Sequence, residues 1–310
     1  MRLIRGLHNL KPEHQGCVAT IGNFDGVHRG HQRILASLQA EAKQRSLPVT
    51  VITFEPQPRE YLTPQQAPGR LTSFAEKYHC FAKLGIDQLV CLYFDQKLQQ
   101  LSADQFIDQV LVKGLQVKHL VVGDDFRFGC DRSGDFKKLT EAGQYCGFVV
   151  KPTETVTTGD GERISSTRIR KLAFAGEFQQ VERLLGRPFQ ICGKVIHGQK
   201  LGRQLGVPTA NIKLNRLQLP CSGVFAIKAV IGEQRFNGVA NLGIRPTING
   251  RQPSLEVHLF DFQGNLYGQR MAVEFLQKIR DEKAFSGLSE LQAAIQQDIS
   301  IARNLLIAQL

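Results

Sequence analysis

The stretch Cys17-Val18-Ala19-Thr20-Ile21, followed directly by GNFDGVHRGH at 22–31, decides the fold of the first half of the chain. Its first five residues form a short apolar run, which is typical of a buried parallel strand. Apolar residues then recur at helical spacing over 34–42. The turn residues at 22–26 separate the two patterns. We therefore predict a strand, a phosphate-binding loop and a helix.

Two histidines, His28 and His31, flank Gly30 where this helix is predicted to begin. One interpretation is that they only cap the helix. The other is that they donate hydrogen bonds to an α-phosphate, which gathers negative charge during nucleotidyl transfer, next to the amides of a helix N-terminus. Gly30 lets the backbone approach the phosphate without a side chain in between.

Composition limits the classes of function. The chain has 310 residues, 42% of them hydrophobic, so it has enough apolar residues for two domains. Its net charge of +11 is scattered, and aromatic residues are not interleaved with the basic ones, so phosphorylated small molecules are favoured over nucleic acid. The seven cysteines form no CxxC and no zinc-type spacing, which predicts reduced, mostly buried thiols. Without a signal peptide or membrane-spanning segment, we expect a cytoplasmic protein.

Apolar runs alternate with helical patterns through the first half, which predicts right-handed βαβ units and a doubly wound parallel sheet. The runs are Cys17–Ile21, Val49–Phe54, Gln88–Tyr93, His119–Val122 and Gly147–Val150. Ligands of such sheets bind beyond the carboxyl ends of the strands. The loop GDDFRFG at 123–129, with the acidic pair Asp124 and Asp125, should therefore face the same crevice as the histidine loop. Its aromatics, Phe126 and Phe128, are either core residues or the wall of a ligand pocket.

A third segment, Arg163 followed by ISSTRIR at 164–170, precedes another predicted helix. Ser165 or Ser166 caps that helix, or the hydroxyls and amides bind a polyphosphate to which Arg168 and Arg170 add charge. Two anion sites in one α/β domain indicate a nucleoside triphosphate. Neither is a Walker loop, because GxxxxGK[ST] is absent.

The pattern changes after Leu184-Leu185-Gly186-Arg187-Pro188, where we predict the boundary between domain 1–186 and domain 187–310. Alternating segments and turns then favour an antiparallel barrel. They are Phe189–Val195, Gly223–Ile231, Arg235–Asn241, Ser254–Phe260 and Met271–Ile279. An amphipathic helix should cover the barrel with Leu288, Leu291, Ile295, Ile299, Ala302 and Leu306.

Two further features of this half suggest chemistry. The segment 197–211 contains Gly198, Gly202 and Gly206, which either form turns or belong to a flap whose backbone amides bind phosphates. The segment ends with Thr209 and Asn211, whose side-chain oxygens are suitable ligands for Mg²⁺. In the strand at 254–259, Glu256 alternates with apolar residues. It is either an exposed surface residue or a base for an attacking alcohol.

With six motifs in order, the chain resembles the bacterial bifunctional riboflavin kinase/FAD synthetase family over nearly its whole length. The motifs are GNFDGVHRGH at 22–31, GDDFRFG at 123–129, ISSTRIR at 164–170, GKVIHGQKLGRQLGVPTANI at 193–212, GVANLGIRPTI at 238–248, and LEVHLFD at 255–261 followed by LYGQ at 266–269. The resemblance implies a Rossmann-like nucleotidyltransferase domain and a six-stranded barrel. It implies that riboflavin and ATP give FMN, and that FMN and ATP give FAD and pyrophosphate.

The resemblance also implies roles for individual residues. His28 and His31 would act on the α-phosphate, and Glu256 would be the kinase base. Residues implied to bind nucleotide or flavin are Gly22, Asn23, Phe24, Asp25, Gly30, Asp125, Phe126, Phe128, Ser165, Ser166, Thr167, Arg168, Arg170, Gly198, Gly202, Arg203, Gly206 and Pro208. Thr209 and Asn211 would hold Mg²⁺ with ATP.

Two alternatives stay open from the sequence. The chain could be a single-activity nucleotidyltransferase with a C-terminal ligand-binding module. The presence of metal-type residues together with Glu256 argues against this alternative, because a binding module needs neither a metal site nor a base. It could also be a flavin-sensing regulator that binds RNA or protein. Our main hypothesis predicts small-molecule substrates, no nucleic acid or membrane partner, and a monomer or weak homo-oligomer.

Overall fold

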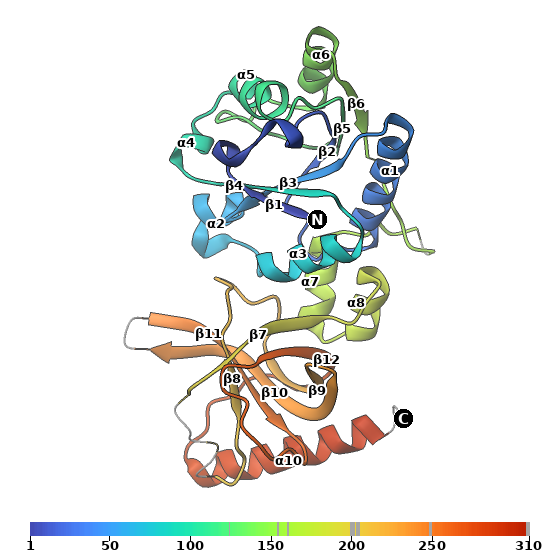
Figure 1. Cartoon of the computed structure of the whole chain (residues 1–310). Coiled ribbons are helices and arrows are strands. Elements are labelled where there is room, and N and C mark those ends of the chain that lie inside the picture. Colours follow the sequence, from blue (N-terminus) through green and yellow to red (C-terminus); the bar gives the residue numbers. More distant parts are fainter. Residues whose placement is uncertain are drawn as a thin grey trace. The chain divides into compact units, whose positions relative to one another are not determined.

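The computed structural model describes residues 1–123, 125–153, 155–159, 161–198, 202, 205–247 and 250–307. Its contacts divide the chain into two compact units, Met1–Ala67 with Phe74–Ser165, and Pro68–Ser73 with Ser166–Leu310 (Figure 1). None of the helices in the described ranges is long and apolar enough to span a bilayer.

The first unit is a six-stranded parallel sheet in the order β1-β4-β3-β2-β5-β6. Its strands are β1 (Arg2–Arg5), β2 (Val18–Ile21), β3 (Val49–Glu55), β4 (Gln88–Tyr93), β5 (His119–Val122) and β6 (Val149–Pro152). Its helices are η1 (Leu7–Asn9), η2 (Pro12–His14), α1 (Arg29–Arg45), α2 (Pro58–Leu62), η3 (Pro64–Gln66), α3 (Phe74–Lys83), α4 (Gln96–Gln99), α5 (Ala103–Phe106), the π-helix η4 (Ile107–Gly114) and α6 (Phe136–Cys146).

The sheet is covered on both faces, because alternate residues of its strands enter two separate cores. Val51 of β3 packs in the core with Leu35 and Leu38 of α1. Its neighbour Ile52 packs in the other core, with Val110 of η4. The predicted doubly wound parallel sheet is therefore confirmed.

Two elements differ from the expected strands of this unit. The sequence analysis missed β1, whose four residues pair with β4 at the edge of the sheet. The last strand begins at Val149 instead of Gly147, because Gly147 adopts a left-handed conformation (φ 77°) that ends α6.

The second unit is a closed antiparallel barrel in the order β10-β11-β8-β7-β12-β9, so the expected six-stranded barrel is confirmed. Its elements are α7 (Ser166–Ala175), α8 (Phe178–Leu185), β7 (Gln190–Ile196), β8 (Ala210–Ile212), β9 (Gly223–Ile231), β10 (Gln234–Thr247), β11 (Gly250–Leu259), β12 (Arg270–Arg280) and α10 (Leu288–Ile307). The sequence analysis named five of these strands and missed β8.

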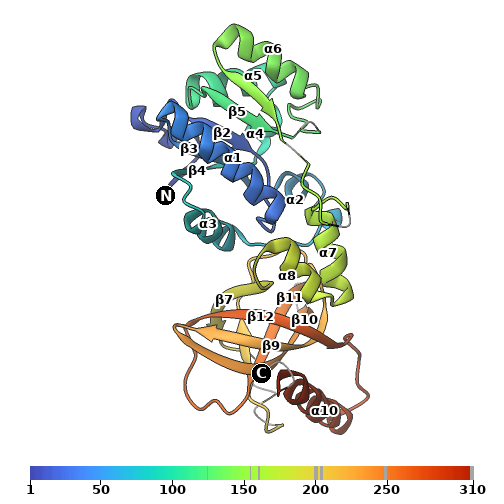
Figure 2. The ribbon, with the colours of Figure 1, turned by 90° about the vertical axis from the view of Figure 1, so that its right-hand side faces the viewer.

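Helices α8 and α10 lie at opposite ends of the barrel (Figures 1 and 2). Phe178 of α8 joins an aromatic cluster with Phe189, Phe225 and Phe275. On α10, Ala302 packs against the barrel as predicted, together with Ile299 and Leu306, whereas Leu288 is 64% exposed because it is the first residue of the helix.

Helix α8 ends at Leu185, and Gly186 caps it in the left-handed conformation. Helices α7 and α8 belong to the same compact unit as the barrel, whereas we expected the first domain to include them. The boundary at residue 186 therefore stays a prediction about independent folding.

Candidate active sites

The histidine loop and the loop at 123–129 leave neighbouring strands of the parallel sheet. After β2 the chain continues to β3 on one side, and β5 pairs with β2 on the other. The order of the strands thus reverses between β2 and β5, which is where ligands bind in sheets of this class. Both loops begin at the carboxyl ends of these two strands.

Strained backbone shapes the loop between β2 and α1. Phe24 (φ 47°) and Val27 (φ 40°) adopt positive φ angles without being glycine. For a β-branched residue such as Val27 this conformation is unusual, and strain of this kind costs about 1–3 kcal/mol per residue. Hydrogen bonds hold it: the Val27 N–H donates to the Phe24 carbonyl (3.1 Å), and Gln32 Nε2 donates to the Val27 carbonyl (2.9 Å).

A buried lysine from α3 supports the same loop. Lys77 is 0% exposed, and its Nζ donates a hydrogen bond of 2.6 Å to the Asn23 carbonyl. The sequence analysis missed this residue. The sequence offered one signal for its burial: Lys77 lies four residues before Phe81, so both side chains share one face of the helix.

The two histidines stack on each other at the start of α1. Their ring centroids lie 3.6 Å apart at 17°. The backbone N–H of His31 donates to Nδ1 of His28 (3.3 Å), so the neutral His28 carries its proton on Nε2. A Cβ atom on Gly30 would come within 3.1 Å of the His28 ring and 3.5 Å of the Ile164 carbonyl. His28 is therefore a helix cap, and Gly30 makes room for the stacked imidazoles.

His31 stays neutral at physiological pH. Burial, together with nearby His28 and Lys77, holds the pKa of His31 well below its usual range. Its buried Nδ1 has no hydrogen-bond partner among the residues that the structure describes. Phe24 packs edge-on against the His31 ring (5.0 Å) and against Phe81 (5.6 Å). A neutral imidazole with one unpaired nitrogen is suited to hydrogen bonding with a ligand.

The other residues predicted around this site have different surroundings. Phe24 and Phe128 are core residues, and Phe126 stacks on Phe128 at 5.4 Å. Asp25 is buried, whereas the Asp125 side chain is 72% exposed and lies 3.9 Å from Arg163. Gly22 lies against Phe24, since a Cβ there would come within 3.2 Å of its ring. Asp124 lies outside the described residues.

The segment 164–170 passes from one compact unit to the other. Ile164 and Ser165 belong to the first unit, and Ile164 lies over Gly30. Ser166, Thr167, Arg168 and Arg170 lie in the first half of α7, in the second unit. There Arg170 Nε donates a hydrogen bond of 2.7 Å to the Gly69 carbonyl.

An aromatic group that the sequence analysis missed lies at the carboxyl ends of β3 and β4. Phe94 packs edge-on against Phe54 (6.0 Å) and Tyr61 (5.6 Å), and Tyr61 is 39% exposed. Aromatic residues at the ends of two adjacent predicted strands were the available signal. They offer an apolar surface to a flat ligand.

In the barrel, the candidate residues form a row across three neighbouring strands. Asn241 of β10 pairs with Glu256 of β11, and Glu256 pairs with Asn211 of β8. Residues that pair directly share one face of a sheet. The register therefore places these three side chains side by side.

Glu256 is held from both sides. Its side chain is 23% exposed. Arg245 of β10 contacts Oε1, and the hydroxyl of Thr209 donates to Oε2 at 3.4 Å. These residues and Asn211 line one cavity of about 270 Å³. Glu256 is therefore half-buried and paired instead of fully exposed, and its role as the base stays a prediction. Arg245 was missed by the sequence analysis, because only the strand register brings it to Glu256.

The cavity has polar and apolar parts, since charged side chains such as Glu256, Arg280 and Asp298 line it together with apolar ones. Val224, Val239, Phe285, Leu291 and Ile295 contribute its apolar lining.

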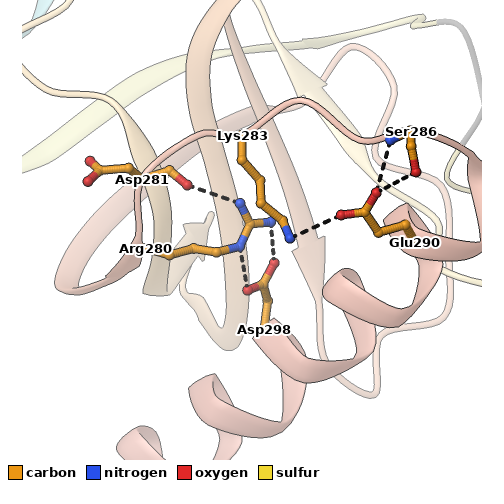
Figure 3. Close-up of polar contacts among 6 residues, drawn as sticks. All are labelled: Arg280, Asp281, Lys283, Ser286, Glu290 and Asp298. Atoms are coloured by element: carbon orange, nitrogen blue, oxygen red, sulfur yellow. Dashed lines mark hydrogen bonds and ion pairs between the residues drawn. The ribbon is translucent and has the colours of Figure 1, made fainter.

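Ion pairs fix one side of this cavity to α10 (Figure 3). Arg280 forms two hydrogen bonds with Asp298 (2.9 and 2.7 Å), and Glu290 accepts from Lys283 (3.4 Å) and Ser286 (2.8 Å).

A second cavity, of about 330 Å³, shares Thr209 with the first. Pro208, Ala210, Phe262 and Tyr267 also line it. Two adjacent cavities that meet at one hydroxyl suit two substrates whose reacting atoms must come together.

The glycines of the segment 197–211 allow close packing around these cavities. A Cβ on Gly198 would fall 2.3 Å from the Asn211 amide, and one on Gly202 would fall 2.4 Å from the Val207 carbonyl. Gly206 has φ +76°, which favours glycine. The Pro208 carbonyl accepts from His258 Nδ1 at 2.8 Å, so that nitrogen carries a proton. Arg203 lies outside the described residues.

Thr209 and Asn211 fit a magnesium ion that is shared with a nucleotide. Both line the cavity next to Glu256, and their oxygens are hard ligands. No group of three or more acidic, histidine or cysteine side chains that could hold a metal occurs in the described part of the chain. Mg²⁺ in phosphate-transfer sites is held by few protein ligands, with waters and phosphates completing the shell.

Comparison with known proteins covers both halves. A family model described as FAD synthetase matches residues 10–168, and one described as riboflavin kinase matches residues 185–306. The bifunctional riboflavin kinase/FMN adenylyltransferase of Pseudomonas fluorescens is 54% identical over 98% of both chains. That of Escherichia coli K12 is 49% identical over 98% of this chain and 97% of its own.

A solved structure shares the fold of the whole chain. It is a crystal structure described as a macrolide-efflux protein from Streptococcus pneumoniae, with 30% identity and a TM-score of 0.78, and the match covers 98% of this chain and 99% of that one. The identities and coverage above show that the chain belongs to the bifunctional riboflavin kinase/FMN adenylyltransferase family.

Proposed function

We propose that each half of this enzyme performs one of two consecutive reactions. The barrel transfers the γ-phosphoryl group of ATP to riboflavin and gives FMN and ADP. The parallel-sheet domain then transfers the adenylyl group of a second ATP to FMN and gives FAD and pyrophosphate. The observation that carries this proposal is the presence of two separate polar sites, one around Glu256 and one around His28 and His31.

In the kinase reaction, Glu256 accepts the proton of the ribityl 5′-hydroxyl as its oxygen attacks the γ-phosphorus and ADP leaves. Arg245 and Thr209 hold the carboxylate in place. Thr209 and Asn211 would hold Mg²⁺, which screens the charge of the phosphates when bound. The cavity lined by Leu291 and Ile295 receives the flavin.

The nucleotide of the kinase reaction occupies the second cavity, beside Pro208. We assign Gly198, Gly202 and Gly206 to a flap over its phosphates, and Arg203, which lies outside the described residues, stays a prediction from the sequence motif.

In the adenylyl transfer, an oxygen of the FMN phosphate attacks the α-phosphorus of ATP and pyrophosphate leaves. His28 and His31 donate hydrogen bonds to the non-bridging α-oxygens, where negative charge develops. The strained loop fixes the imidazoles before ATP arrives, so little reorganisation is needed.

The remaining residues of this site bind substrates. From their sequence motif alone, we assign the triphosphate to Ser165, Ser166, Thr167, Arg168 and Arg170. The loop residues Gly22, Asn23, Phe24, Asp25 and Gly30 shape the nucleotide site, and Asp125, Phe126 and Phe128 contribute to the flavin pocket. We extend that pocket to the aromatic group of Phe54, Tyr61 and Phe94.

Incubation with riboflavin, ATP and Mg²⁺, followed by chromatography, tests the proposal. The bifunctional enzyme yields FMN and then FAD. A single-activity nucleotidyltransferase yields FAD from added FMN only, and a flavin-sensing regulator yields neither product. Omission of Mg²⁺ should abolish both steps.

The wider setting of the protein is also part of the proposal. It acts in the cytoplasm as a monomer or weak homo-oligomer, with domains 1–186 and 187–310. Light scattering at micromolar concentration and cell fractionation test the first two statements.

A further inference from the structure

The side-chain oxygen of Asn241 is a buried acceptor next to the proposed base. Asn241 lines the cavity of Glu256 and pairs with it directly in the sheet. Its Oδ1 is buried and has no hydrogen-bond partner among the residues that the structure describes. Buried polar atoms in native proteins nearly always have a partner, so an unpaired one in a substrate cavity indicates a ligand that donates to it.

The Glu282 carboxyl lies next to this amide and lines the same cavity. Burial raises the pKa of the Glu282 carboxyl, and hydrogen bonds from the Ile244 backbone N–H and the Asn241 side chain oppose that increase. A Cβ on Gly243 would fall 1.8 Å from Glu282 Oε1, so this carboxyl lies directly on β10. A carboxylate accepts from the NH₂ group of an amide, and this leaves Oδ1 as the free end of Asn241.

The chemistry of riboflavin determines which donor can reach Oδ1. Its donors are the ribityl hydroxyls and the imide N–H at the far end of the ring system. The 5′-hydroxyl must lie within hydrogen-bond distance of Glu256 in order to react. Directly paired residues have Cβ atoms about 4.5–5.5 Å apart. The donor beside the 5′-hydroxyl is the 4′-hydroxyl, whereas the whole ribityl chain separates the imide from this place.

We propose that Asn241 is a specificity-determining residue, whose Oδ1 accepts a hydrogen bond from the 4′-hydroxyl of the ribityl chain. This inference rests on the proposed role of Glu256. A substrate without that hydroxyl leaves Oδ1 buried and unpaired, and sites built to bind a hydroxyl reject such analogues. The expected preference for riboflavin over 4′-deoxyriboflavin is about tenfold in kcat/KM.

The test measures kcat/KM for riboflavin and for 4′-deoxyriboflavin with the full-length enzyme. Wild type should prefer riboflavin by about tenfold. Asn241→Ala should lose most of its activity toward riboflavin while its kcat/KM for the deoxy analogue changes by less than about twofold, because only riboflavin used the acceptor. Asn237→Ala is the matched control, since Asn237 is an exposed residue on the same strand outside this cavity. It should keep the wild-type preference.

Two outcomes overturn the proposal. One is a wild-type enzyme that does not discriminate between the two substrates. The other is a variant that loses equal activity toward both, which is the sign of a purely structural role. If Asn241→Ala loses the cooperative urea unfolding of the barrel and so is misfolded, Asn241→Ser replaces it in the same measurement. Glu256→Gln is assayed in parallel: normal turnover there contradicts the role of Glu256, whereas an inactive Glu256→Gln with unchanged discrimination in Asn241→Ala contradicts only the role of Asn241.

Discussion

The two sites are assembled in different ways. In the parallel-sheet unit, His28 and His31 lie in one short segment at the start of α1, the helix that follows β2. In the barrel, Thr209, Arg245 and Glu256 come from three different segments of the chain, 36 and 11 residues apart in order, and meet because the strands pair. The first arrangement can be recognised in a sequence as one motif. The second can be understood only when the pairing of strands is known.

The backbone differs as well. The histidine loop contains strained residues such as Val27, whereas the row of Asn241, Glu256 and Asn211 lies on regular paired strands. A loop needs several hydrogen bonds to hold functional groups in place, and a sheet provides that rigidity through its ladder. We therefore expect local substitutions in the barrel site to affect chemistry more than folding.

The largest effect should follow Glu256→Gln, which keeps the shape of the side chain and removes its basicity. Riboflavin phosphorylation should fall by about 10²–10⁴-fold in kcat, because proton transfer matters in the transition state. The KM for ATP and the conversion of FMN to FAD should change little. Glu274→Gln, on β12 outside the cavity, is the matched control. Phosphorylation within about threefold of wild type would show that Glu256 is not the base.

The converse experiment replaces His28 or His31 by Ala. FAD formation should fall by about 10²-fold or more, the usual loss for a donor to a developing oxyanion. Riboflavin phosphorylation should survive, since the barrel site is separate. His79→Ala, on the exposed side of α3, should leave both reactions unchanged. A parallel loss of both reactions in a folded His28→Ala enzyme would contradict the assignment to one site.

A third prediction concerns where the barrel unit begins. A boundary at residue 186 predicts that a fragment 187–310 folds and phosphorylates riboflavin. That fragment lacks Phe178, which packs against Phe189, Phe225 and Phe275. Loss of one buried Phe usually costs about 3–5 kcal/mol. We expect a fragment 166–310 to be more stable than 187–310 by at least this amount in urea unfolding. Equal stabilities would show that α8 contributes nothing to the barrel fold.

The smallest effect is a pH dependence of stability. The pKa of His31 in the folded chain lies well below the usual histidine value of 6.5, so the unfolded chain binds a proton that the folded chain does not. His31 therefore does not lower the free energy of unfolding above pH 6.5. Below pH 6.5, this free energy falls by up to about 1.4 kcal/mol per pH unit, because protonation of His31 favours the unfolded chain. Urea unfolding at pH 5.5, 6.5 and 7.5 gives the free energy of unfolding at each pH. This free energy should change less with pH in His31→Gln than in wild type or His79→Gln. An unchanged slope would argue against a neutral, buried His31.

Several elements could not be predicted from their own residues. The strand β8 is only three residues long and owes its existence to pairing with β7 and β11. The edge strand β1 has arginines at both ends, and only its pairing with β4 identifies it. Leu288 fits the helical pattern of α10 but lies beyond the part of the helix that packs on the barrel. Local pattern reports which residues prefer burial, and tertiary pairing decides which of them are buried.

The sequence by itself determined the alternation that builds the parallel sheet, the barrel with its covering helix, and the motif of His28 and His31. These features depend on neighbours along the chain, because period and turn chemistry are local properties. Only the tertiary structure decided that Lys77 supports the histidine loop, that Arg245 contacts Glu256, and that Asn241 presents an unpaired oxygen beside it. These contacts join residues on different elements of the chain, and strand register and helix packing, which no local pattern encodes, bring them together.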